Sequence, residues 1–242
     1  LRTVDSRVTK IIALLRSRLN SGSQPRILAV KFRDRAHAGR ELAERLVAQG
    51  AGADAIVLGI PRGGVILADI VASRLGADFD IVIPRKLGAP ENDELAIGAV
   101  MQDGTSYLNK YLVNALRISE EYLEKEKTRQ ISEIVRRSAA YRKQDLAYRI
   151  AGKKAIVVDD GIATGATVIA SARWVRKQNP GKLTIAVPVA PTQSVEVLEE
   201  EADSVMAVHK SREFNAVGQF YEQFDPVTDE QVQSIMRTRG LL

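Results

Sequence analysis

The chain has 242 residues, 27% of them charged, and its formal net charge is +5. This length suffices for one well-cored domain or one domain with an appendage, and the absence of cysteine excludes disulfides, thiolate nucleophiles and cysteine-ligated metal sites. No apolar run reaches the roughly 18 residues of a membrane-spanning helix, and the apolar patch at residues 11–15 is too short for a signal-peptide core, so we expect a cytoplasmic protein without membrane contact.

Apolar and amphipathic segments alternate along the chain. A helical pattern at residues 4–19 lies in an N-terminal appendage, residues 1–25, and we expect the main domain to occupy residues 26–242. Apolar runs predict strands at residues 26–32, 55–60, 79–84, 96–101, 154–158, 183–190 and 204–208. The helical patterns between them include residues 34–47, 65–75 and 167–177. This series indicates an α/β fold in which helices cover both faces of a parallel twisted sheet.

One segment interrupts the alternation. Residues 118–150 predict a single long helix, capped by Ser119 and with Glu120 and Glu121 in its first turn. We interpret residues 117–150 as a helical insertion whose apolar face either covers the core or forms an interface. Residues 117–154 also hold 11 Lys and Arg against 6 Asp and Glu. A solvated helix face explains this basic excess best, and a site for an anionic ligand or partner is the alternative; nucleic acid is not the expected partner.

The stretch VVDDGIATGAT places two carboxylates beside a tight turn. A strand ends at Asp159 and Asp160, Gly161 and Gly165 allow the turn, and a helix follows. Backbone N–H groups at a helix N-terminus bind phosphate, whereas the carboxylates suit vicinal hydroxyls and a magnesium ion. The combination therefore predicts a phosphorylated sugar. Paired aspartates also occur in phosphoacceptor and metal sites, but the dinucleotide and P-loop fingerprints are absent.

This stretch resembles the 5-phosphoribosyl-1-pyrophosphate (PRPP) motif of the type I phosphoribosyltransferases. Further segments resemble that family in the same order, among them FRDRAHAGRELAERL, VLGIPRGGVILADIVASRLG, IPRKLGAPENDELAIGAV, VPVAP and FNAVGQFYEQFDPVTDEQV. The whole set is most similar to bacterial and archaeal members that are assigned from sequence and whose acceptor is unsettled. The resemblance implies a type I core with a small hood, here at about residues 203–240, and a homodimer.

The resemblance also implies roles for individual residues. Asp159 and Asp160 would bind the ribose hydroxyls and Mg²⁺. Arg62, Arg85 and Lys86 would neutralise the leaving pyrophosphate, and a cis peptide bond is expected between Pro61 and Arg62. The remaining PRPP contacts would come from the pyrophosphate loop and the motif, namely Pro61, Gly63, Gly64, Gly161, Ile162, Ala163, Thr164, Gly165, Ala166 and Thr167. Alternatively, PRGG is an ordinary strand-to-helix turn, and Arg85 and Lys86 are solvated strand ends.

The acceptor and the general base are the least defined parts of this interpretation. Many purine-using relatives carry an aspartate where this chain has Ala163, so the acids of an expected mobile loop, residues 87–95, become candidates: Glu91, Asp93 and Glu94. Pro188 and Val189 offer no donor side chain for a 6-oxopurine. The aromatic and apolar residues after the last strand either line the hood over the base or pack in the core, with core packing favoured; they are Phe214, Val217, Phe220 and Tyr221.

Three functions stay open at this point. The leading one is a magnesium-dependent transferase that moves the phosphoribosyl group of PRPP to a nitrogenous base or small amine and releases pyrophosphate. The second is a regulatory or binding protein that senses PRPP or a nucleotide. The third is hydrolysis or pyrophosphorolysis of a ribose phosphate without a base.

Overall fold

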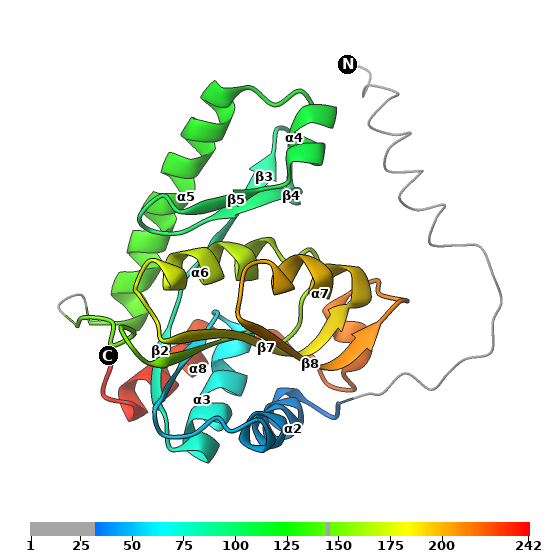
Figure 1. Ribbon diagram of the computed structural model, residues 1–242. Coiled ribbons are helices and arrows are strands. Elements are labelled where there is room, and N and C mark those ends of the chain that lie inside the picture. Colours follow the sequence, from blue (N-terminus) through cyan, green and yellow to red (C-terminus); the bar gives the residue numbers. More distant parts are fainter. Residues whose placement is uncertain (1–31, 144–145) are drawn as a thin grey trace.

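The computed structural model describes residues 32–143 and 146–242 (Figure 1). The expected N-terminal helix, the appendage at residues 1–25 and all but the last residue of the expected first strand lie outside the described residues. That last residue, Phe32, is fully buried and forms an isolated parallel bridge with Tyr221.

Five parallel strands form the central sheet. Their order is β2-β1-β6-β7-β8, and their bounds are Asp78–Ile81, Ala55–Gly59, Lys154–Val158, Lys182–Pro191 and Ser204–Ser211 respectively. β1 is buried along its whole length. Strands buried on both faces require apolar side chains at successive positions, which explains the continuous apolar runs in the sequence.

Helices cover both faces of this sheet, so the expected α/β fold is confirmed. The helices α2 (Arg35–Ala48), α3 (Gly63–Leu75) and α8 (Asp229–Thr238) lie on one face, and α6 (Ala166–Arg176) and α7 (Thr192–Glu199) lie on the other (Figure 1). Each face has its own buried apolar cluster. Successive residues of β1 alternate between them, because Val57 belongs to the cluster with Leu42 and Leu58 belongs to the cluster with Ile169.

A second, antiparallel sheet holds the strand that was expected at residues 96–101. Its strands are β3 (Arg85–Ala89), β4 (Asn92–Val100) and β5 (Ser106–Leu108). Placing residues 96–101 in the parallel sheet was therefore wrong. Residues 87–95, expected as a mobile loop, form a β-hairpin. The short connection between β3 and β4 explains the antiparallel pairing, because parallel strands need a long crossover.

The helical insertion expected at residues 117–150 contains α5 (Glu120–Tyr141), and a short helix, α4 (Lys110–Ala115), precedes it. The cap is as predicted, since the Ser119 hydroxyl accepts a hydrogen bond from the Tyr122 N–H. The prediction that the helix continues to residue 150 is wrong. It ends at Tyr141 because Arg142 has an extended backbone, with φ −146° and ψ 139°, and its buried guanidinium pairs with Asp80 of β2.

The C-terminal residues 203–240, where the hood and a helix were expected, contain three parts. β8 belongs to the central sheet, and α8 packs against α3 and α5. Only the stretch around the short 3₁₀ helix η1 (Val217–Phe220) lies over the end of β7 and the PRPP-like motif. Within the described ranges, no helix is long and apolar enough to cross a membrane.

Candidate active site

The candidate site lies at the carboxyl ends of β1 and β6, which are neighbours in the sheet. Gly59 pairs with Val158 at the end of the register, and the Ile60 N–H donates to the Val158 carbonyl at 2.9 Å. The helix after β1 covers one face of the sheet, whereas the helix after β6 covers the other (Figure 1). Ligands of open α/β sheets bind at such a reversal point. The PRGG loop and the DDGIATG turn therefore meet where a ligand is expected.

The two loops are in direct contact, and glycine makes this possible. A Cβ atom at Gly63 would clash with the Asp160 carboxylate, and one at Gly64 would lie 2.6 Å from the Val158 carbonyl oxygen. The backbone of the PRGG loop can approach the motif only because both residues lack a side chain. The Pro61–Arg62 peptide bond is cis, as the family resemblance implied.

The motif forms the wall of a cavity of about 320 Å³. The Ile162 N–H donates to the carbonyl of Val189 at 2.9 Å, which fixes the turn to the end of β7. Gly165 has a φ of +79° and immediately precedes α6, so the first N–H groups of this helix lie beside the cavity. The cavity is lined by Arg35, Lys86, Asp159, Asp160, Gly161, Ile162, Ala163, Thr164, Gly165, Thr167, Val168, Val217 and Phe224.

The negative charges of Asp159 and Asp160 are unfavourable in this cavity, because the two carboxylates are partly buried and repel each other. Burial raises the pKa of Asp159 well above its usual range, and the negative charge of Asp160 raises it further. Burial also raises the pKa of Asp160, although the hydrogen bond and the charge of Arg35 oppose this rise. Hydroxyl donors or a cation would relieve the repulsion between the two carboxylates.

These two carboxylates suit a magnesium ion whose remaining ligands come from a substrate and water. No group of three or more acidic or histidine side chains that could hold a metal occurs within residues 32–143 and 146–242. Magnesium commonly takes one or two protein carboxylates and completes its shell with substrate oxygens and water. Asp159 and Asp160 match that donor set.

The sequence profile of the phosphoribosyl transferase domain family matches residues 31–224. This chain belongs to the phosphoribosyl transferase family. Two Mycobacterium tuberculosis proteins, provisionally named phosphoribosyl transferases, are each 38% identical over 205 residues, which cover 85% of this chain and 46% of theirs. The chain thus spans 46% of the length of these curated relatives. A Thermus thermophilus protein of known crystal structure is 44% identical, with a TM-score of 0.71, covering 85% of this chain and 97% of that one.

Of the basic residues that the sequence suggested for pyrophosphate, the structure places only one at the cavity. Lys86 lines the cavity, but Arg85 does not, because neighbouring residues of β3 point to opposite faces. The Arg85 Nε instead donates to Gln130 Oε1 of α5 at 2.9 Å, and burial, followed by the charge of Arg137, lowers the pKa of Arg85. Arg62 also points away from the cavity, with its Nη1 3.4 Å from Asp229 Oδ1.

The acids proposed as bases lie on the β3–β4 hairpin, outside the cavity lining. Glu91 occupies the turn with a φ of +63°, and Glu94 is exposed on β4. Asp93 pairs with Arg129 of α5 at 3.5 Å. The structure therefore does not bring these three side chains together with Asp159 and Asp160.

Two residues that line the cavity, Arg35 and Phe224, were not assigned roles from the sequence. The buried Tyr221 donates its hydroxyl to the Asp160 carbonyl at 2.6 Å, a contact that the sequence did not indicate either. Of the aromatic and apolar residues considered for the hood, Phe220 and Tyr221 are core residues, whereas Val217 does line the cavity. Arg35 lies 125 positions from its partner Asp160, so no local pattern indicates the contact.

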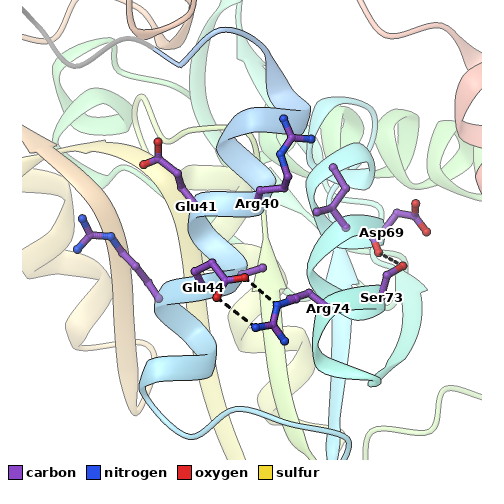
Figure 2. A pocket seen from close by; sticks show the side chains of 9 residues that line it. Arg40, Glu41, Glu44, Asp69, Ser73 and Arg74 are labelled. Atoms are coloured by element: carbon purple, nitrogen blue, oxygen red, sulfur yellow. Dashed lines mark hydrogen bonds and ion pairs between the residues drawn. The ribbon is translucent and has the colours of Figure 1, made fainter.

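A larger hollow lies elsewhere, between α2 and α3. Figure 2 shows it crossed by Glu44 and Arg74, whose two hydrogen bonds measure 2.7 and 3.2 Å. Its volume is about 820 Å³, and Arg40, Asp69 and Ile70 also line it. It shares no lining residue with the cavity at the motif.

Proposed function

We propose that this protein is a magnesium-dependent transferase that moves the 5-phosphoribosyl group of PRPP to a nitrogenous base or small amine and releases pyrophosphate. The observation that carries the proposal is the convergence of two neighbouring carboxylates, Asp159 and Asp160, with the N-terminus of α6 in one cavity. The PRGG loop does not line this cavity, but its Gly63 and Gly64 pack directly against the two aspartates. A phosphate suits the helix N-terminus, and the ribose hydroxyls suit the carboxylates.

The cavity supplies the groups that such a transfer needs. Asp159 and Asp160 would accept hydrogen bonds from the two ribose hydroxyls, and the turn from Ala163 to Thr167 would hold the 5-phosphate. Lys86 would stabilise the negative charge that develops on the departing pyrophosphate, while positive charge develops on the sugar ring. Magnesium bound at Asp159 and Asp160 would supply further positive charge at the phosphate oxygens.

The acceptor is expected to attack with little help from a protein base. Apart from Asp159 and Asp160, no acidic or histidine side chain lines the cavity formed by the described residues. Glu91 and Glu94 would serve as bases only after the hairpin turn had moved over the cavity. A neutral nitrogen with an available lone pair is therefore the acceptor that this arrangement favours.

One observation favours the alternative of a protein that senses PRPP or a nucleotide. The guanidinium groups of Arg62 and Arg85 are held by Asp229 and Gln130, away from the cavity, although a transferase would use positive charge at the leaving group. The presence of Lys86 in the cavity supports the transferase more directly.

The test is pyrophosphate release from PRPP and Mg²⁺ in the presence of a panel of bases and amines. The control is the doubly substituted protein Asp159→Asn/Asp160→Asn, and omission of Mg²⁺ with a chelator tests the metal. Release that depends on one acceptor and on both aspartates supports the transferase. PRPP binding without release with any acceptor supports the sensor, and release that no acceptor changes supports hydrolysis. Equal behaviour of wild type and control contradicts the proposal.

The remaining expectations from the family resemblance are also proposals. We propose that the protein acts in the cytoplasm as a homodimer, without membrane or nucleic-acid partners. Light scattering on the purified full chain measures the oligomeric state directly, and a monomer at micromolar concentration would contradict the dimer.

A further inference from the structure

Arg35, the first residue of α2, connects three separate parts of the molecule. Its Nε donates to Asp160 Oδ2 at 2.8 Å, and its Nη1 donates to the Asp225 carbonyl at 2.7 Å. The guanidinium carbon lies 3.9 Å from the centre of the Phe224 ring. Arg35 and Asp160 are mostly buried, with side chains 12% and 15% exposed. One side chain thus joins α2, the motif at Asp160 and the 224–225 loop, whose Phe224 lines the cavity.

Asp160 is held on its backbone side as well. The Tyr221 hydroxyl donates to the Asp160 carbonyl at 2.6 Å, and the Tyr221 and Phe224 rings lie 4.8 Å apart. The residues that hold the carboxylate and the carbonyl of Asp160 therefore pack against one another. The orientation of this carboxylate is determined before any ligand enters.

Without a counter-charge, the Asp160 carboxylate would be repelled by its neighbour. The Asp159 carboxylate accepts a hydrogen bond from the Asp160 N–H at 2.8 Å. This contact holds the Asp159 side chain beside the backbone of Asp160. Two negatively charged carboxylates that lie close together repel each other, which disfavours the arrangement in which both point toward one ligand. Arg35 supplies the opposite charge on the side of Asp160 that faces the loop of Phe224 and Asp225.

We propose that Arg35 is a positioning residue that fixes the Asp160 carboxylate and the 224–225 loop together, so that the carboxylate that binds the sugar and the Phe224 wall of the cavity depend on one side chain. This inference rests on the proposed binding of PRPP. The planar guanidinium donates from two nitrogens in a fixed geometry and stacks on an aromatic ring, whereas a lysine ammonium is a single point charge. A lysine at this position would keep the charge but not the simultaneous contacts to Asp160 and Asp225.

Binding of PRPP with Mg²⁺, measured by isothermal titration calorimetry on the full chain, tests the proposal. We expect Arg35→Gln to weaken PRPP binding by about 10- to 100-fold, the usual effect of losing a residue that orients a ligand-binding group. Arg35→Lys should be intermediate. Arg40→Gln is the matched control, because Arg40 lies on the same helix and is exposed at the α2–α3 hollow. It should bind PRPP like the wild type.

A double-mutant cycle separates positioning from general stability. If Arg35 acts through Asp160, Arg35→Gln should weaken binding only slightly further in a protein that already carries Asp160→Asn. The proposal would be overturned if the fold-losses in PRPP affinity of Arg35→Gln and Asp160→Asn multiplied in the double variant. It would also be overturned if Arg35→Gln bound PRPP with wild-type affinity. Failure of the wild type itself to bind PRPP would instead contradict the proposed function, so the two failures are distinguishable. Thermal unfolding of each variant verifies that the proteins compared are folded.

Discussion

Arg142 and Asp80 form an ion pair inside the protein, with both side chains only 5% exposed. Nε and Nη2 of Arg142 each donate to an Asp80 carboxylate oxygen at 2.9 Å, and the guanidinium lies 4.0 Å from the centre of the Tyr148 ring. Because Arg142 directly follows α5 and Asp80 belongs to β2, this contact attaches the inserted helix to the edge of the central sheet.

Arg142→Gln should lower the free energy of unfolding by about 3–5 kcal/mol, because it leaves the Asp80 carboxylate buried without its counter-charge. Denaturation by urea measures the change. Arg74→Gln is the control, since Arg74 makes an exposed ion pair with Glu44, and it should leave the midpoint almost unchanged. Asp80→Leu/Arg142→Met removes both charges and should be less harmful than Arg142→Gln alone. Equal effects of Arg142→Gln and Arg74→Gln would contradict the prediction.

The pH dependence of stability should contain a contribution from Glu126, a buried acid of α5. Burial alone would raise its pKa, but hydrogen bonds from Arg129, Gln130 and the Gly88 N–H together hold the pKa below its ordinary value of 4.5. An acid with a depressed folded-state pKa stabilises the fold above its unfolded pKa, and that stabilisation is lost as the pH falls through the folded pKa.

Glu126→Gln should therefore destabilise the protein most at neutral pH, and its difference from the wild type should shrink below about pH 4. Urea denaturation at a series of pH values measures this difference. Glu124→Gln provides the control, because Glu124 lies on the same helix and is 72% exposed. A gap between Glu126→Gln and wild type that stays constant with pH would show that Glu126 contributes through packing alone.

Local sequence patterns were sufficient for strand β6 and for the turn that follows it. β6 begins and ends where the apolar run at residues 154–158 predicted, and the turn after it has the glycine conformation that its composition indicated. Both features depend on neighbours in the sequence. A strand buried on two faces needs a continuous apolar run, and a residue with positive φ favours glycine.

Contacts between distant residues explain what the sequence did not show. α5 has no glycine or proline at its end, and it stops at Tyr141 because Asp80, 62 positions away, binds Arg142. The adjacent residues Arg85 and Lys86 were treated as one basic pair, although strand alternation directs only Lys86 into the cavity. The same limit applies to Arg35 of α2, whose partner Asp160 lies after β6, 125 positions away.

The carboxylate pair should reduce the stability of the ligand-free protein. Asp159→Asn removes one of two neighbouring, partly buried negative charges, so we expect a higher thermal unfolding midpoint at neutral pH together with weaker PRPP binding. Differential scanning calorimetry without ligand measures the midpoint. Glu41→Gln, an exposed carboxylate of α2, is the control and should shift it little. An Asp159→Asn protein that is less stable than the wild type would contradict the electrostatic conflict inferred at this site.

The contact between the motif and the stretch above it can be tested at Gly161. A Cβ at this position would lie 2.5 Å from Val217 Cγ1 and 3.0 Å from Val189 Cγ1. Gly161→Ala should therefore displace η1 from the cavity, costing about 1–3 kcal/mol of stability, as overpacking typically does, and weakening PRPP binding. Val217→Ala, added to Gly161→Ala, removes the clashing methyl groups and should restore much of both losses. Gly52→Ala serves as the control, because the nearest atom to its Cβ is Asp54 Oδ1 at 4.0 Å. If Val217→Ala restored neither property, the steric origin of the defect would be excluded.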